Sequence, residues 1–485
     1  MPGYDTHGHD TLFIGGEWVS PSSAARIAVR NASTEEPIGE TPEAAEADAD
    51  AAVAAARRAF DDPSGWSRWE PARRGEALDR LAAELEQRAP QIGRLVSQQN
   101  GMPIALSPLI EGMTPVGTLR YMVSLLAGSP VEEETARFLG GDLIIRHEPI
   151  GVVAAIVPWN YPQTLASFKY APALAAGNTV VLKPSPETVL DACVLAEAVL
   201  AAGLPPGVIN IVPGGRELGA YLVQHRDVDK VAFTGSTAAG RQIAEVCGRL
   251  LRPVSLELGG KSAAIILDDA DLDLAKIGQN LFAATLVNNG QTCYAGTRIL
   301  APRSRYGEVV DTFAAFASSL QVGDALDPGT LIGPLVSERQ RDRVERYIAK
   351  GKSDGARLVT GGGRPAGLDA GWFVEPTIFA DVDNKSTIAQ EEIFGPVLSV
   401  IQYTDTDDAI RIANDSDYGL GGSVWTTDPA RARDVVRRVR TGTMGINSYL
   451  PDPAGPWGGV KSSGVGRELG PGAIAAYQNL KTVYA

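Results

Sequence analysis

The hydrophobic and polar positions of the chain follow two different patterns. In residues 43–60 and 70–98, Ala and Leu recur at helical spacing, with Glu and Arg between them. We therefore expect the chain to be rich in helix up to about residue 120. Further along, short β-branched runs alternate with helical stretches, which is typical of strands joined by crossover helices.

The first group of these runs predicts a doubly wound parallel sheet. Its strands are expected at Gly151–Val157, Thr179–Leu182, Val208–Val212 and Lys230–Phe233. The helices that follow are expected at Ser167–Ala176, at Leu190–Ala201, in a stretch ending at Gln224, and at Ala238–Cys247. Strand, crossover helix and strand in this order form parallel βαβ units.

The alternation restarts near residues 257–262, which predicts a second α/β domain. Its strands are expected at Ala263–Leu267, Thr297–Ala301, Thr377–Phe379, Val397–Tyr403 and Ser423–Trp425, with helices at Tyr306–Leu320 and Asp407–Ala413. No low-complexity linker separates the two halves. We therefore expect them to pack closely around a cleft, where small-molecule sites usually lie.

The composition indicates a globular protein with a small-molecule partner. The chain has 485 residues and a mass of 51.1 kDa, enough for two or three domains. Hydrophobic residues make up 44% and charged residues 21%, as in soluble proteins. The net charge of -14 and the pI of about 4.9 disfavour nucleic acids and anionic membranes as partners.

Several features favour a cytoplasmic location. Residues 1–10 have neither the basic segment nor the apolar core of a signal peptide, and no uncharged apolar run reaches about 18 residues. The three cysteines are too few for a disulfide framework. His7 and His9 lie in what we expect to be a flexible tail, so we expect no metal site.

Cys293 is the strongest candidate for chemistry. It lies between Gly290 and Gly296, which are expected to let backbone N–H groups approach a reacting carbonyl. A nucleophilic thiol needs a lowered pKa or a nearby base. A core or turn cysteine is the alternative, and it is the interpretation we favour for Cys193 and Cys247, both in predicted helices.

The turn Gly235–Gly240 ends a predicted strand and opens a helix, so its N–H groups suit an anion. It departs from both familiar nucleotide motifs. Thr237 stands where the dinucleotide fingerprint has its second glycine, and Arg241 follows Gly240 where a phosphate-binding loop has lysine. Phosphate binding and a simple strand–helix turn both stay open at this point.

Three further residues have a chemical and a structural interpretation. Glu257 lies between two leucines, and burial would raise its pKa toward that of a general base; a solvated strand end is the alternative. Asn160, in the stiff turn Pro158–Pro162, could donate to an oxyanion or merely close the turn. Lys183, at a strand end, could bind a hydroxyl or phosphate group or face solvent.

The order of these motifs resembles that of the aldehyde dehydrogenase superfamily along essentially the whole chain, from Gly16-Glu17-Trp18 to Leu480–Val483. Seven motifs carry the resemblance. They are Pro158–Pro162, Lys183-Pro184-Ser185, Phe233–Thr237, Glu257–Ser262, Gly290–Cys293, Glu391–Pro396 and Pro456–Gly464. The family implies a Rossmann-type cofactor domain, an α/β catalytic domain and a small β-flap for oligomerisation.

The resemblance implies a catalytic role for three residues. Cys293 matches the nucleophile, which forms a thiohemiacetal and, after hydride passes to the nicotinamide, a thioester. The Asn160 side chain and the N–H of Cys293 match the oxyanion hole. Glu257 matches the general base for hydrolysis of the thioester. Cofactor contacts are implied for Trp159, Lys183, Gly235, Ser236, Glu392 and Phe394.

One position departs from the family pattern. Many relatives have glutamate three residues after the lysine, where it binds the adenosine ribose; here Pro186 occupies that position and Glu187 follows. A missing carboxylate would remove repulsion of a 2′-phosphate. We expect NAD as cofactor, with NADP not excluded.

The substrate-pocket positions of the family match a largely apolar and aromatic set without arginine. This favours aliphatic or aromatic aldehydes over semialdehydes, while Asp452 nearby leaves an amino-aldehyde open. The matching residues are Tyr161, Leu165, Phe168, Thr292, Tyr294, Tyr449 and Trp457.

The resemblance also implies a domain division. Residues 1–126 and 150–256 would form the cofactor domain, residues 257–471 the catalytic domain, and residues 127–149 and 472–485 the flap, which joins dimers or tetramers. Two alternatives to a hydrolytic enzyme are a CoA-acylating relative and a non-catalytic structural protein. The presence of Glu257 disfavours the first, and the complete set of Cys293, Glu257 and Asn160 disfavours the second.

Overall fold

The first sheet contains every strand predicted between residues 151 and 233. The structure is a computed structural model that describes residues 9–484. Eight strands lie in the order β19-β11-β10-β7-β8-β9-β1-β2, and the five central ones are parallel. Their bounds are β7 (Val152–Ile156), β8 (Thr179–Lys183), β9 (Ile209–Ile211), β10 (Lys230–Thr234) and β11 (Val254–Glu257).

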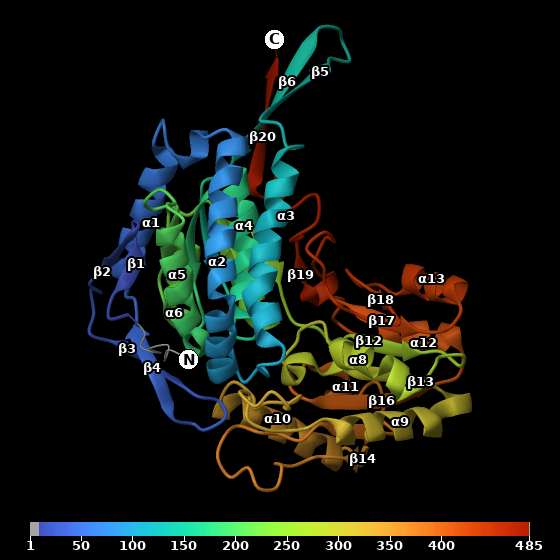
Figure 1. The fold of residues 1–485 in the computed structure, drawn as a ribbon. Helices are drawn as coiled ribbons and strands as arrows, with labels where there is room; N and C mark the ends of the chain where they lie inside the picture. The colour runs from blue at the N-terminus through green and yellow to red at the C-terminus, as the bar shows by residue number, and fades with distance from the viewer. Residues whose placement is uncertain (1–8, 485) are drawn as a thin grey trace.

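Helices cover both faces of this sheet (Figure 1). Successive side chains of a strand point to opposite faces: Val153 and Ala155 join the hydrophobic core under one layer of helices, and Val152 and Ala154 join the core under the other. The helices are α1 (Glu46–Asp61), α2 (Pro71–Asn100), α3 (Thr114–Leu126), α4 (Pro162–Ala176), α5 (Leu190–Ala201), α6 (Arg216–Gln224) and α7 (Thr237–Leu250).

The ends of the first sheet differ from the sequence-based expectation. β1 (Leu12–Ile14) and β2 (Glu17–Val19) pair antiparallel beside β9, and β3 (Arg26–Arg30) pairs with β4 (Pro37–Pro42), all in the part expected to be rich in helix. At the other end, β19 (Gly464–Val465) pairs antiparallel with β11. β1 and β2 have three residues each and β19 has two, which is too few for a recognisable alternation. β3 and β4, which form a separate two-stranded sheet, have five and six residues and were missed all the same.

The second sheet confirms the second α/β unit. Its order is β14-β15-β16-β13-β12-β17-β18, with all neighbours parallel except β14 and β15. The strands are β12 (Ala263–Ile266), β13 (Arg298–Pro302), β14 (Arg357–Thr360), β15 (Thr377–Ala380), β16 (Val397–Tyr403), β17 (Gly422–Trp425) and β18 (Gly445–Ile446). The helices are α8 (Leu274–Thr285), α9 (Tyr306–Ser319), α10 (Glu338–Ser353), α11 (Thr387–Gln390), α12 (Thr406–Asn414) and α13 (Pro429–Arg438).

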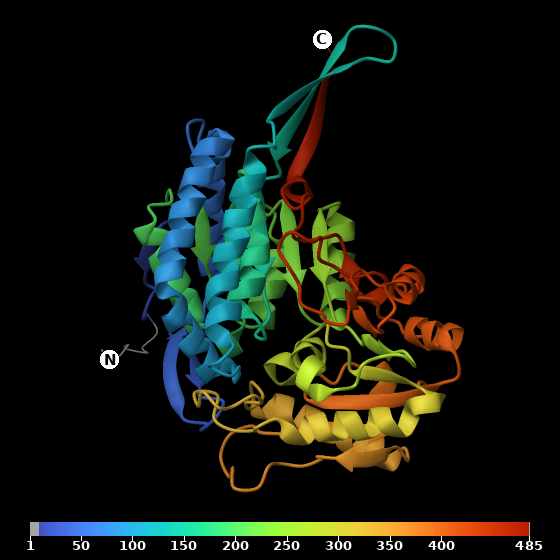
Figure 2. The same cartoon turned by 45° about the vertical axis from the view of Figure 1, so that its right-hand side comes forward.

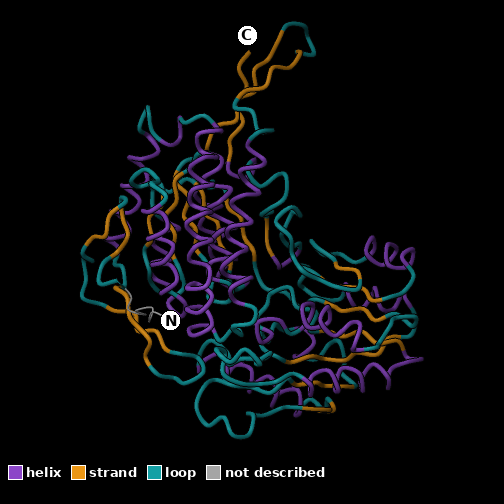
Figure 3. Tube along the Cα trace, in the orientation of Figure 1, coloured by secondary structure: helices purple, strands orange, loops and turns teal. Residues whose placement is uncertain are grey.

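A third, antiparallel sheet projects from the body beside the C-terminus (Figures 1 and 2). It joins β5 (Glu132–Ala136), β6 (Asp142–Pro149) and β20 (Gln478–Tyr484) in the order β20-β6-β5. The tube drawing shows its strands as a narrow arm above the helices of the first unit (Figure 3). The division into domains and the function of this arm stay predictions.

Between residues 9 and 484 no helix combines the length and the apolar character that crossing a bilayer requires.

Candidate active site

The segment before Cys293 has an unusual backbone. Asn288, Asn289 and Gly290 are all left-handed, with φ of 52°, 60° and 73°. The side chain of Asn289 holds this turn: its Nδ2 donates to Gly101 O and Pro334 O, both at 2.8 Å, and its Oδ1 accepts from Gly333 N at 2.7 Å. Such backbone is maintained only where the surroundings enforce it, as is common at functional sites.

The glycines around Cys293 allow close packing of the segment; the approach of their N–H groups to a reacting carbonyl stays a prediction. A Cβ on Gly290 would lie 2.3 Å from Gly395 O, and one on Gly296 would lie 3.1 Å from the Cβ of Ala264. Gly260 is equally constrained, because its Cβ would lie 2.2 Å from the carbonyl oxygen of Cys293. The cysteine segment is therefore enclosed by backbone on both sides.

Asn160 lies beside the cysteine segment, as the oxyanion assignment requires. Its Nδ2 donates to Gln291 O at 3.0 Å, which leaves one N–H of the side-chain amide available. Its own backbone carbonyl accepts from Asn288 Nδ2 at 2.8 Å and from Asn100 Nδ2 at 3.3 Å. The structure thus brings Asn160 and the Cys293 loop together from two different sheets.

Cys293 rests as a thiol in this environment. The residue is half-buried, and desolvation raises the pKa of its thiol, with smaller contributions from the charges of Glu392 and Glu257. The backbone N–H groups of Cys293 and Tyr294 favour the thiolate and act in the opposite direction. Attack on a carbonyl therefore requires a base to take the thiol proton.

Glu257, at the end of β11, is buried and not solvated. Its side chain is 2% exposed, and neither carboxylate oxygen has a hydrogen-bond partner. Desolvation raises the pKa of Glu257 well above its ordinary value, the charge of Glu468 raises it further, and Lys169 lowers it. A bare, buried carboxyl group with a high pKa suits a general base near neutral pH.

Lys169 and Glu468 form a buried ion pair next to Glu257 that the sequence analysis did not identify. The Lys169 Nζ donates to Glu468 Oε1 at 2.8 Å and to Thr234 Oγ1 at 2.6 Å, and the side chains are 0% and 1% exposed. The signal was present in the sequence, because Lys169 interrupts the otherwise apolar face of Pro162–Ala176. A buried lysine requires a buried acid partner.

A cavity of about 550 Å³ lies at the carboxyl ends of β7, β8 and β10. The winding direction of the sheet reverses between β7 and β10, and a topological switch point is where open α/β sheets bind ligands. Its apolar walls come from α6 and α7, and its other lining residues include Trp159, Lys183, Gly235 and Ser236.

The cavity residues fit the adenosine and phosphate parts of a dinucleotide. Ser236 is the N-cap of α7, its Oγ accepting from Ala239 N at 3.3 Å, so the positive end of that helix faces the cavity. Lys183 is buried, donates to Gly214 O at 2.6 Å, and has a pKa lowered to about 8 by desolvation. The solvated alternative for Lys183 is therefore wrong.

Trp159, Phe394 and Glu392 lie between this cavity and Cys293. The rings of Trp159 and Phe394 meet edge to face with centroids 5.3 Å apart. Glu392 Oε1 accepts from Gly260 N at 2.9 Å, and desolvation raises the pKa of Glu392 to about 7. Gly259 leaves room for the carboxylate, since a Cβ there would lie 2.5 Å from Glu392 Oε2.

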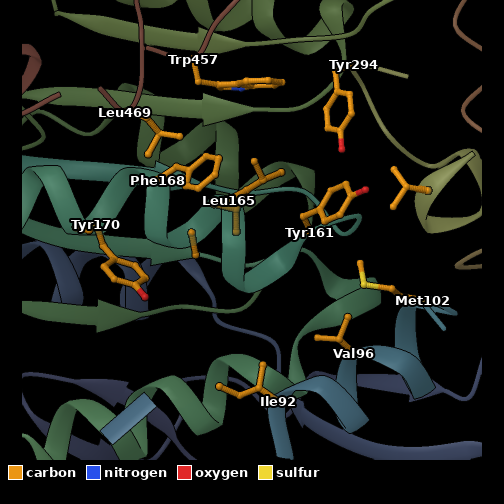
Figure 4. Packing of buried hydrophobic residues seen from close by; sticks show 14 of the residues in the cluster. Ile92, Val96, Met102, Tyr161, Leu165, Phe168, Tyr170, Tyr294, Trp457 and Leu469 are labelled. Atoms are coloured by element: carbon orange, nitrogen blue, oxygen red, sulfur yellow. The ribbon is translucent and has the colours of Figure 1, made fainter. Parts of the chain in front are cut away.

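The predicted substrate-pocket residues converge on one side of Cys293. Figure 4 shows Tyr161, Leu165 and Phe168 on α4 facing Trp457 and Tyr294, whereas Tyr170 points away. The Tyr294 ring meets Tyr449 at 4.9 Å and Trp457 at 5.7 Å, both edge to face.

The polar groups in and near this pocket have hydrogen-bond partners within the protein. Tyr161 Oη and Thr292 Oγ1 are 2.6 Å apart, which ties α4 to the residue before the nucleophile. Asp452 is exposed, and its Oδ1 accepts from Ala454 N at 2.8 Å within its own turn.

Comparisons with known proteins agree with this geometry. Residues 18–483 match the model of the aldehyde dehydrogenase family. The chain is 56% identical over 476 residues to the geranial dehydrogenase of Castellaniella defragrans, covering 98% of each. It superposes on a Mycobacterium tuberculosis aldehyde dehydrogenase complexed with NAD⁺ with a TM-score of 0.96 and 49% identity, covering 99% of this chain and 98% of that one.

A further solved relative holds both a cofactor and a substrate. Aldehyde dehydrogenase C of Pseudomonas syringae, as a mutant complexed with NAD⁺ and octanal, superposes with a TM-score of 0.93 and 40% identity, covering 98% of this chain and 96% of that one. The family match, the relatives and the shared arrangement of both sheets leave one conclusion. The chain belongs to the aldehyde dehydrogenase family.

Proposed function

We propose that the protein oxidises apolar aldehydes to carboxylic acids with NAD, through a covalent intermediate on Cys293. The observation that carries this proposal is the meeting of three groups from separate elements. The Asn160 amide is hydrogen-bonded to Gln291 O, two residues before Cys293, with one N–H left free. The bare carboxyl of Glu257 is near enough for its charge to raise the pKa of the Cys293 thiol. A nucleophile, an oxyanion donor and a base are the requirements of acyl chemistry.

In the first half-reaction Cys293 attacks the aldehyde carbon. Its thiol proton must leave as the C–S bond forms. Water or the carboxylate of Glu257, whose charge contributes to the raised pKa of Cys293, accepts it, and a proton taken by Glu257 must pass on to water before that residue can act again. The developing oxyanion is met by the Asn160 amide and the N–H of Cys293. The product is a thiohemiacetal, whose carbon must then lose a hydride to become the thioester.

The cofactor cavity supplies the partner for that step. When bound, NAD provides the hydride acceptor. Lys183 and the N-terminus of α7 at Ser236 would hold its adenosine and phosphate parts, and Glu392 would bind the ribose next to the nicotinamide.

In the second half-reaction Glu257 activates water to hydrolyse the thioester. Its carboxylate takes a proton from water as the C–O bond forms, and Cys293 leaves as the sulfur takes back a proton. Lys169 favours the ionised form of Glu257, and Glu468 opposes it. The buried pair therefore sets the pH at which the base becomes available.

The substrate class follows from the aromatic and aliphatic lining. Leu165, Phe168, Tyr294, Tyr449 and Trp457 are all buried, and such a lining favours chains without charge. One solved relative holds octanal, and another relative is named for geranial; both compounds are uncharged aldehydes. Medium-chain aldehydes such as octanal and geranial are the substrates we infer.

The test follows the absorbance of reduced cofactor with purified protein, NAD and either octanal or geranial, in the absence of CoA. We expect turnover that the Cys293→Ala variant abolishes and that betaine aldehyde, a cationic control substrate, supports poorly. Turnover only after CoA is added would contradict the role of Glu257. Preference for the cationic aldehyde would contradict the substrate class.

We further infer that NAD is preferred to NADP, because Glu187 provides the carboxylate that position 186 lacks. Glu187 lines the cofactor cavity beside Lys183, and it accepts from Ser185 Oγ at 2.6 Å and from Arg339 Nη2 at 2.8 Å. A carboxylate fixed at this edge would bind ribose hydroxyls and repel a 2′-phosphate.

Self-association and location are inferred from surface features. The arm of β5, β6 and β20 exposes Phe138, Leu139 and Leu480, and an edge of this kind is usually covered by another chain. Family members generally form oligomers, so the partner we infer for the arm is a second copy of this chain. Free thiols at Cys193, Cys247 and Cys293 suit a reducing, cytoplasmic compartment.

A further inference from the structure

The last residue of α2, Asn100, and the connection from there to α3, residues 101–113, contact both halves of the active site. Asn100 Nδ2 donates to Trp159 O at 2.9 Å and to Asn160 O at 3.3 Å. Gly101 O accepts from Asn289 Nδ2 at 2.8 Å, in the turn before Cys293. One segment thus braces the oxyanion donor and the nucleophile loop at the same time.

Glu111 lies in this connection and is fully buried. Its Oε2 accepts from the backbone N–H of Gln163 at 2.8 Å and of Thr164 at 3.3 Å. Both N–H groups belong to the first turn of α4, where they have no partner within the helix. The N-cap residue Tyr161 makes no side-chain capping bond, so a carboxyl group from a distant part of the chain caps α4.

The first turn of α4, which Glu111 caps, positions two residues of the active site. Asn160 directly precedes the N-cap Tyr161, and the Tyr161 hydroxyl lies 2.6 Å from Thr292 Oγ1, next to Cys293. Thr164 Oγ1 also donates to Ile110 O at 2.6 Å, beside Glu111. A shift of the first turn of α4 would therefore move Asn160 and Tyr161 relative to the thiol.

We propose that Glu111 is a positioning residue for the reaction: by capping α4 it fixes the Asn160 amide over the carbon that Cys293 attacks. This inference rests on the proposed function. An oxyanion donor misplaced by about 1 Å loses much of its contribution. Burying a carboxyl group is unfavourable in free energy. A cap with a structural role alone could be a serine or asparagine at the N-cap itself, which avoids that penalty.

Burial favours the protonated, uncharged form of the Glu111 carboxyl group. Desolvation raises the pKa of Glu111 to about 8, and the charge of Asp191 raises it further against hydrogen bonds from Thr164 and Gln163. Tyr161 and Tyr170 also face this carboxyl group. Because the group is mostly protonated at neutral pH, glutamine should replace it closely, with a carbonyl oxygen that still accepts from both N–H groups.

The test uses two probes of Cys293 that need no cofactor. Hydrolysis of p-nitrophenyl acetate passes through a tetrahedral oxyanion, whereas alkylation by iodoacetamide does not. We expect Glu111→Ala to lower ester acylation by about tenfold or more and to leave the alkylation rate within about threefold. Glu111→Gln should restore most of the loss.

Glu86→Ala is the matched control, because Glu86 accepts from Arg120 between α2 and α3 at 2.5 Å on the surface; it should leave both rates unchanged. Equal loss of acylation and alkylation in Glu111→Ala would overturn the proposal in favour of a purely structural role, and so would unchanged acylation. If the wild-type protein is alkylated but neither hydrolyses the ester nor oxidises octanal, the proposed function fails as well.

Discussion

Glu257→Gln separates the two half-reactions. Glutamine has the shape of glutamate but cannot take a proton. The substitution should therefore remove the base without disturbing the packing of a side chain that is 2% exposed and makes no hydrogen bond. We expect hydride transfer to be retained where another base takes the thiol proton, and hydrolysis of the thioester to become slow.

The size of the rate loss depends on pH, and the structure indicates the direction in which it changes. A positioned general base contributes about 10²–10⁴-fold. The pKa of Glu257 is raised well above its ordinary value, so its carboxylate becomes available only at higher pH than that of an ordinary glutamate. The loss caused by the substitution should be about 100-fold at pH 7 and should grow as pH rises, because a larger share of the wild-type carboxyl is then ionised.

The assay is rapid mixing of enzyme and NAD with octanal at several pH values. We expect the variant to release about one equivalent of reduced cofactor per active site in a burst, followed by slow turnover. Glu245→Gln, an exposed acid on α7, serves as the control. An unchanged steady-state rate would refute the assignment of Glu257 as the base for hydrolysis. Loss of the burst would instead place Glu257 before hydride transfer.

Three further substitutions test neighbouring groups. Lys169→Met removes the charge that lowers the pKa of Glu257, so kcat near pH 7 should fall by about tenfold and recover at alkaline pH; an unmoved pH profile would contradict this. Asn160→Ala should lower kcat by about 10²–10³-fold without slowing alkylation of Cys293 by iodoacetamide, and slower alkylation would indicate a misfolded loop. Glu187→Gln should lower the ratio of kcat/KM for NAD over NADP by about tenfold, whereas an unchanged ratio would transfer cofactor selection to other residues.

Most of the parallel strands could be predicted from sequence because they are largely apolar runs, whereas the parallel strands β11 and β18 were not among the predicted ones. Val152–Ile156 and Thr179–Lys183 are buried on both faces, and such strands stand out against the helices between them. Gly464–Val465 could not be found in this way, because two residues have no periodicity and pair with β11 only through tertiary structure. The early start of α4 at Pro162 follows from the preference of proline for the first helical turn.

The candidate site was predicted residue by residue, but not the forces that hold it. Cys293, Asn160 and Glu257 could be named from their motifs, whereas the contacts that fix them come from distant segments. Glu111 and Asn289 act through backbone groups far along the chain. Hydrogen bonds of this kind leave no local pattern, since any buried polar side chain at the right place in the fold would serve.

The carboxyl groups of Glu257, which is buried, and Glu392, which is half-buried, differ in their surroundings. Glu392 accepts a hydrogen bond from Gly260 and is influenced by Arg343 and Lys261, which limits its pKa to about 7. Glu257 accepts no hydrogen bond, and the charge of Glu468 raises its pKa further.

Glu392, with a pKa of about 7, would hold ribose hydroxyls as a partly ionised group, while burial favours the protonated form of Glu257. A proton held there must leave before the residue can act as a base. Movement of the cofactor or substrate that brings water to Glu257 would lower its desolvation and hence its pKa. The carboxyl group that is costly to ionise in the resting protein would thus become a base once the thioester admits water to the site.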